Sequence, residues 1–90
     1  KVVAYIYSKI TGMGVEYSTD QPGIQFYTGN MMKESYNGKH NRNYGLQYGM
    51  CLETQIFPDA INQPDFPSTI LKKDETYSSN TKIKLRNDFI

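Results

Sequence analysis

Residues 51–71 read CLETQIFPDAINQPDFPSTIL, and this stretch contains the pattern that decides the fold. It begins with residues that favour β-strands, among which lies one carboxylate, Glu53. It then becomes a loop in which Pro58, Pro64 and Pro67 restrict the backbone. A strand that carries a carboxylate and is followed by a restricted loop is suited to hold an active site.

Short strand patterns recur along the rest of the chain, and no segment has the 3.6-residue apolar spacing of an amphipathic helix. We expect strands at residues 2–7, 15–19, 24–28, 49–57 and 77–85, and a further short strand at 68–71. Residues 33–45 are polar and rich in Asn, which predicts a long exposed loop. The sequence therefore predicts an all-β protein whose loops carry the specificity.

The composition limits what this chain forms alone. Its 90 residues allow one domain, and only 38% of them are hydrophobic, with a mean hydropathy of −0.64. A chain of this size buries little apolar surface, so we expect some strands to complete a β-sandwich sheet supplied by other sequence. The chain also begins at Lys1 rather than Met, and we expect it to be part of a longer protein.

Charge and cysteine content exclude several classes of function. A net charge of +1 gives no electrostatic basis for binding nucleic acid or an anionic membrane, and no apolar stretch reaches the ~20 residues that span a bilayer. The single Cys excludes an internal disulfide and a cysteine zinc cluster. We therefore expect no metal and a reducing, cytoplasmic location.

Glu53 is the first candidate for chemistry. In a strand, Cys51, Glu53, Gln55 and Phe57 share the face opposite Met50, Leu52, Thr54 and Ile56. One interpretation is a solvent-facing Glu, which is the common state of this residue. The other is a general base held on a rigid strand and partly shielded from water by Phe57.

Other polar residues have similar pairs of interpretations. Gln25 shares a strand face with Tyr27, either to contact sugar hydroxyls or as ordinary cross-strand pairing. Asp59 follows Glu53 by six residues, either as the second carboxylate of a glycosidase or as a loop Asp that accepts nearby hydrogen bonds. His40, the only histidine, is expected to be solvated, and Cys51 to be a small packed residue.

Two long motifs give the chain a family resemblance. They are residues 21–30, QPGIQFYTGN, and the run from Cys51 to Leu71 that includes PDAINQP, in this order. Together they resemble the C-terminal part of aldose 1-epimerases (galactose mutarotases). With the flanking strands the resemblance covers most of the chain, and it is weakest in residues 31–48 and after Leu85.

The resemblance implies a fold and a reaction. Family members are more than twice this length and form a large antiparallel β-sandwich with a sugar cleft on one sheet. Glu53 then matches the general base that takes the proton from the anomeric hydroxyl, and Gln25 matches a substrate contact. The family's general acid is a His that protonates the ring oxygen. That His, a second substrate His, and the substrate-binding Arg and Asp belong to earlier sequence, and His40 matches neither His.

These implications define the expected function and its alternatives. We expect residues 1–90 to be the C-terminal part of one aldose 1-epimerase-like domain, inactive alone and without a cofactor. Its partners are then an aldose sugar and the remainder of that domain. The alternatives are a non-catalytic sugar-binding or scaffold protein of the same fold, and a hexose-phosphate epimerase, for which Lys33, Lys39 and Arg42 offer cations.

Overall fold

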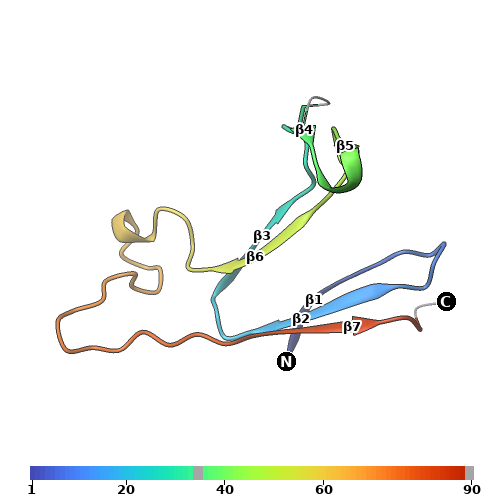
Figure 1. Ribbon diagram of the computed structural model, residues 1–90. Coiled ribbons are helices and arrows are strands. Elements are labelled where there is room, and N and C mark those ends of the chain that lie inside the picture. Colours follow the sequence, from blue (N-terminus) through green and yellow to red (C-terminus); the bar gives the residue numbers. More distant parts are fainter. Residues whose placement is uncertain (34–35, 89–90) are drawn as a thin grey trace. The chain divides into compact units, whose positions relative to one another are not determined.

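The regular elements among the described residues are β-strands and two short 3-10 helices (Figure 1). The computed structural model describes residues 1–33 and 36–88, and of Tyr36 it describes the backbone alone. The strands are β1 (Val2–Tyr7), β2 (Gly14–Thr19), β3 (Gly23–Tyr27), β4 (Tyr36–Asn37), β5 (Asn43–Tyr44), β6 (Cys51–Gln55) and β7 (Thr81–Arg86). The 3-10 helices are η1 (Lys39–Asn41) and η2 (Ala60–Asn62). The predicted all-β class is confirmed.

The chain divides into two compact units. The first unit contains residues 1–23 and 56–90, and the second contains residues 24–55. In the first unit the strands form one sheet with the order β1-β2-β7. In the second unit β3 pairs with β6, and β4 pairs with β5.

The strand predictions hold best near the N-terminus. β1 has the predicted bounds, β2 begins one residue early, and β3 both begins and ends one residue early. β6 is shorter than the predicted strand at 49–57, and β7 begins at Thr81 rather than Tyr77. The strand predicted at 68–71 is wrong, because these residues are exposed and have no strand beside them. The expected loop at 33–45 contains β4, η1 and β5, while residues 34–35 lie outside the described residues.

A tight turn joins β1 to β2. Gly12 has a φ of +71°, a left-handed conformation that glycine adopts without a Cβ clash. Its N–H donates to the Ser8 carbonyl at 2.9 Å, and the Ser8 N–H donates to the Met13 carbonyl at 2.8 Å. The turn sets the register in which Tyr7 lies opposite Gly14.

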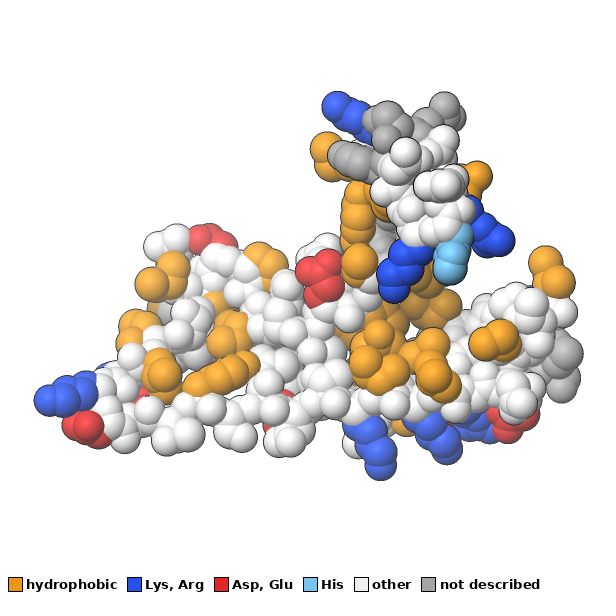
Figure 2. Space-filling model, in the orientation of Figure 1, with side chains coloured by type: hydrophobic (Ala, Val, Ile, Leu, Met, Phe, Trp, Pro, Cys, Tyr) orange, Lys and Arg blue, Asp and Glu red, His pale blue; other side chains and the backbone are white. Residues whose placement is uncertain are grey.

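The sheet of the first unit has one apolar and one polar face. Residues directly opposite one another on neighbouring strands project to the same side. The apolar face consists of two rows, Ala4–Tyr17–Ile83 and Ile6–Val15–Leu85. The polar face consists of the rows Tyr5–Glu16–Lys84 and Tyr7–Gly14–Arg86. Basic side chains accordingly gather along the lower edge of the space-filling view (Figure 2).

Hydrogen bonds between distant residues attach β7 to β2. The Asp20 carboxylate accepts the Asn80 N–H at 3.0 Å, and the Asp20 N–H donates to the Asn80 carbonyl at 3.2 Å. The hydroxyls of Thr19 and Thr81 lie 3.0 Å apart. At the other end, the Arg86 Nη1 donates to the Glu16 Oε1 at 2.7 Å. These contacts fix the C-terminal strand against a hairpin formed about 60 residues earlier.

The described residues contain almost no hydrophobic core. Ala60, which is 6% exposed, is their one buried hydrophobic residue. On the apolar face Ile83 is 55% exposed and Leu85 is 77% exposed. Burying each such side chain contributes about 1.5–3 kcal/mol, and a folded domain has a net stability of only about 5–15 kcal/mol. The exposed apolar rows therefore represent a large part of the stability that a complete domain needs.

We predict that the isolated 90-residue chain unfolds without cooperativity. Its apolar face stays in contact with water, so hydrophobic burial does not offset the conformational entropy of the ordered chain. Circular dichroism during heating should show a gradual change without a sigmoidal transition, and the chain should bind the dye ANS. A sharp thermal transition without dye binding would contradict this prediction.

Candidate functional site

The second unit holds both residues predicted to act on substrate. Gln25 lies in β3 and Glu53 lies in β6, and these two strands are hydrogen-bonded neighbours (Figure 1). Both side chains are exposed. The fold thus brings onto one sheet two residues that are 28 positions apart in sequence.

Tyr27 stabilises the chain just after β3. Its hydroxyl accepts the backbone N–H of Met31 at 3.1 Å, and its side chain is half-buried. Gln25 lies two residues earlier in the same strand, so it projects to the same face as Tyr27. The tyrosine is thus held by a hydrogen bond of its own, while the Gln25 amide lies exposed beside it.

A group of hydrogen bonds joins the two ends of the segment between β3 and β6. The Asn30 Oδ1 accepts the Gln47 Nε2 at 2.8 Å, and the Asn30 Nδ2 donates to the Thr28 Oγ1 at 2.8 Å. The Gly29 carbonyl accepts the backbone N–H groups of Met32 at 3.2 Å and Gln47 at 3.1 Å. We call this group, formed by residues 28–30 and 47, the amide clasp.

Gly29 is required at the centre of the amide clasp. Its φ is +74°, and a Cβ built on it would lie 3.0 Å from the Gly49 carbonyl oxygen. A side chain at this position would therefore meet both backbone strain and a close backbone contact. Gly49, in contrast, has open space around the position of a Cβ.

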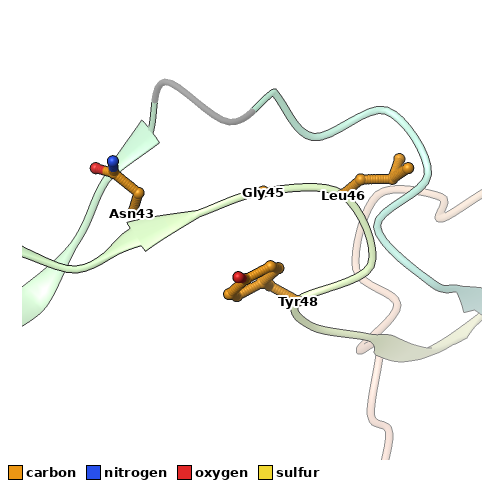
Figure 3. A pocket seen from close by; sticks show the side chains of 4 residues that line it. All are labelled: Asn43, Gly45, Leu46 and Tyr48. Carbon is orange, nitrogen blue, oxygen red and sulfur yellow. The ribbon is translucent and has the colours of Figure 1, made fainter.

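A hollow of about 320 Å³ lies in the second unit between β5 and β6. Its lining includes Asn43, Gly45, Leu46 and Tyr48, which follow one another along the chain (Figure 3). Tyr48 is 71% exposed, so its ring lies open to solvent. An exposed ring and an amide are groups that contact sugars, but the residues of this hollow do not include Gln25 or Glu53.

Asp59 lies in the first unit and has hydrogen-bond partners of its own. Its carboxylate accepts the Asn62 Nδ2 at 2.5 Å and the Gln63 Nε2 at 3.0 Å. These bonds, that from Asn62 first, lower the pKa of the Asp59 carboxyl below its ordinary value. A glycosidase general acid needs the opposite shift, since it must be protonated near neutral pH. Asp59 is therefore unsuited to be a general acid, and its bonds to Asn62 and Gln63 are those expected of a loop Asp that accepts nearby hydrogen bonds.

We predict that removing the amide partners raises the pKa of Asp59. In Asn62→Ala the carboxylate loses its first hydrogen-bond donor, so its pKa should move toward the value of about 3.9 for an unperturbed Asp. Because the folded-state pKa is lowered, Asp59 stabilises the fold above pH ~3.9, and this contribution is lost as the pH falls through the folded-state pKa. Carbon-detected NMR titration of the carboxyl measures its pKa, and Asn87→Ala is a control that should leave this pKa unchanged.

The remaining candidate residues from the sequence are His40 and Cys51. His40 is exposed, as predicted, and adopts a left-handed backbone conformation with a φ of +57°. Cys51 is exposed, so the prediction of a packed residue is wrong. Among residues 1–33 and 36–88, no three His, Cys, Asp or Glu side chains form a group that could hold a metal ion. In the same residues no helix is long and apolar enough to cross a membrane.

The sequence alone does not identify Asn30 and Gln47 as contacting residues. The signal available was the pair Gly29-Asn30 directly after a predicted strand, which indicates a turn. That signal marks where β3 ends, but it does not identify Gln47 as the partner of Asn30. The contact becomes visible only once the strands are paired.

Comparison with known proteins agrees with the fold. Residues 1–84 match the model of one protein family, described as aldose 1-epimerase. The chain is 47% identical over 74 residues to a galactose mutarotase of Bos taurus, which covers 82% of the chain and 22% of that protein. It is 43% identical over 81 residues to a galactose mutarotase of Homo sapiens, covering 90% of the chain and 24% of that protein.

A bacterial protein is similar over the same region. An aldose 1-epimerase of Escherichia coli is 31% identical over 84 residues, which covers 91% of the chain and 24% of that protein. The chain thus spans about a quarter of the length of the curated relatives it matches.

Proposed function

The chain belongs to the aldose 1-epimerase family, and we propose from this membership that it is part of a mutarotase. The complete protein would interconvert the α and β anomers of a hexose such as galactose or glucose. In this proposal Glu53 is the general base and Gln25 is a substrate contact. The observation that supports it most is the pairing of β3 with β6, the two strands that carry these residues.

The chemistry of the two side chains suits these roles. An ionised carboxylate on a strand is a proton acceptor whose backbone is held in place by the neighbouring strand. An amide both donates and accepts hydrogen bonds, so Gln25 can bind a sugar hydroxyl in either direction. Both side chains are exposed in this chain and are therefore available to a ligand.

The proposed reaction transfers two protons and then reverses both transfers, so the protonation of the catalytic groups has no net change. Glu53 takes the proton from the anomeric hydroxyl while an acid protonates the ring oxygen, and the bond between C1 and the ring oxygen breaks. The product is the open-chain aldehyde. Rotation about the C1–C2 bond turns the other face of the carbonyl toward the hydroxyl that closes the ring. Reversal of both proton transfers then gives the other anomer.

The acid of this reaction comes from other sequence in our proposal. Ring opening without an acid would leave a negative charge on the ring oxygen, so base catalysis alone gives only part of the acceleration. We propose that residues 1–90 are the C-terminal part of a single domain whose remainder supplies the acid and covers the apolar face of β1-β2-β7. The sugar would bind without a cofactor, and the one free cysteine suits a cytoplasmic location.

We predict that Glu53→Gln in the full-length protein lowers kcat about 10²–10⁴-fold, since the amide cannot accept the proton. Polarimetry of freshly dissolved α-galactose or α-glucose measures the rate of approach to equilibrium. The matched control is Glu75→Gln, because that side chain accepts the Lys72 N–H at 3.0 Å and an amide oxygen can do the same. The control should keep the activity of the wild type.

The same assay separates the proposal from its alternatives. A sugar-binding protein without catalysis would bind the hexose and give no acceleration in the wild type. If Glu53→Gln keeps full activity, the assignment of the base is wrong. The isolated chain, assayed in parallel, should leave the rate at the value in buffer, and acceleration by it would contradict the part played by the remainder of the domain.

We predict that Gln25→Ala raises KM about 2- to 10-fold, with a smaller change in kcat. The reason is the loss of a hydrogen bond worth about 0.5–1.5 kcal/mol in the ground state and the transition state alike. Steady-state kinetics on the full-length protein measure both constants. The control is Gln21→Ala, whose amide donates to the Tyr77 hydroxyl at 2.6 Å in the first unit. An unchanged KM in Gln25→Ala would remove Gln25 from the site.

A further inference from the structure

We propose that Asn30 and Gln47 are positioning residues, which fix the register between the strand of Gln25 and the strand of Glu53. The inference rests on the proposed function for its catalytic consequence. Neither residue touches the substrate in this proposal. They act on the backbone that carries the base and the substrate contact.

The amide clasp joins the two strands where both leave their sheet. Asn30 lies three residues after the end of β3, and Gln47 lies four residues before the start of β6. The side-chain bond of 2.8 Å between them is accompanied by the backbone bond of 3.1 Å from the Gln47 N–H to the Gly29 carbonyl. Gln47 adopts a left-handed conformation with a φ of +60°, which non-glycine residues keep only where their surroundings impose it.

Counting residues from the amide clasp along the two strands places Gln25 opposite the part of β6 that contains Glu53. A Cβ on Gly29 would lie 3.0 Å from the Gly49 carbonyl oxygen and 3.5 Å from the Gln47 Cα, so Gly29 lies level with residues 47–49. β3 and β6 run in opposite directions from this point (Figure 1). Four residues back from Gly29 is Gln25, and four residues on from 47–49 is 51–53. The clasp thus determines which residue of β6 faces Gln25.

Register decides which side chains of β3 and β6 lie beside one another. In the described part of the chain β3 and β6 form a sheet of two strands, and such pairs are weakly constrained by hydrogen bonds alone. A slip of one residue would turn every side chain of a strand to the opposite face. A shift of about 1 Å at a reacting group can lower a rate by about 10²-fold. A contact that prevents such a slip therefore acts on catalysis without touching the sugar.

The experiment compares four variants of the full-length protein by steady-state kinetics. Asn30→Ala and Gln47→Ala remove the bond from either side, and each should lower kcat about 10-fold. The double variant should be no slower than the slower single variant, because both remove one interaction. Asn30→Asp should keep the kcat of the wild type, since a carboxylate oxygen still accepts the Gln47 Nε2 and the Thr28 hydroxyl can donate to it.

A matched control and a second measurement make the result decisive. Asn37→Ala removes an exposed amide from β4 in the same segment and should leave kcat unchanged. Amide hydrogen exchange should be faster in β3 and β6 of Asn30→Ala, and unchanged in β1, β2 and β7. This exchange does not depend on activity.

Each outcome decides the inference. Unchanged kcat in both Ala variants, while Glu53→Gln loses activity, would overturn it and leave the proposed function intact. The inference would also be overturned if the losses of the two single variants multiply in the double variant. The same holds if Asn30→Asp is as slow as Asn30→Ala. If the wild type itself has no activity, the proposed function fails. Hydrogen exchange then tests the amide clasp without activity, since unchanged exchange in β3 and β6 of Asn30→Ala would overturn the inference.

Discussion

The apolar face of the sheet β1-β2-β7 is the constraint on which the rest of this structure depends. Strand alternation collects Ala4, Ile6, Val15, Ile83 and Leu85 on one side, and the pairing of β7 with β2 keeps them there. No described residue of the first unit covers this face well enough to bury Ile83 or Leu85. A sheet with one apolar and one polar face is half of a layered fold, and the described residues of the first unit do not supply its second layer.

The polar contacts of the first unit act in a different way from the apolar face. The bonds of Asp20 with Asn80 and of Glu16 with Arg86 hold the C-terminal strand in register, but the first are exposed and the second is only partly buried. Exposed pairs contribute little to stability because water competes for both partners. They select which strand lies beside β2, whereas the free energy that keeps the sheet folded has to come from the apolar face.

The strands could be predicted where local pattern and pairing agree. β1 and β3 are rich in β-branched and aromatic residues, and β2 alternates between apolar and polar residues. Turn residues follow all three strands, and each has a partner within the chain, so sequence alone located them. Residues 68–71 have a similar composition but no strand beside them, and a strand without a partner does not form a ladder. The late start of β7 has a related cause, since the Tyr77 hydroxyl accepts a hydrogen bond from the Gln21 side-chain amide before the pairing with β2 begins.

The proposed site also combines features that a local motif predicts with a contact between distant segments that it does not predict. Motifs located Gln25 and Glu53, and their shared sheet followed from strand pairing, but the contact between Asn30 and Gln47 could not be read from either segment separately. This contact also explains how a segment as long as residues 28–50 can separate two residues of the site that we propose. The entropic cost of closing a loop rises only slowly with its length, by about 0.6 kcal/mol for each doubling. Once the amide clasp joins the ends of the segment, its length and composition beyond the clasp no longer affect the distance between β3 and β6. A long polar segment and a fixed pairing of the two strands are therefore compatible in one short chain.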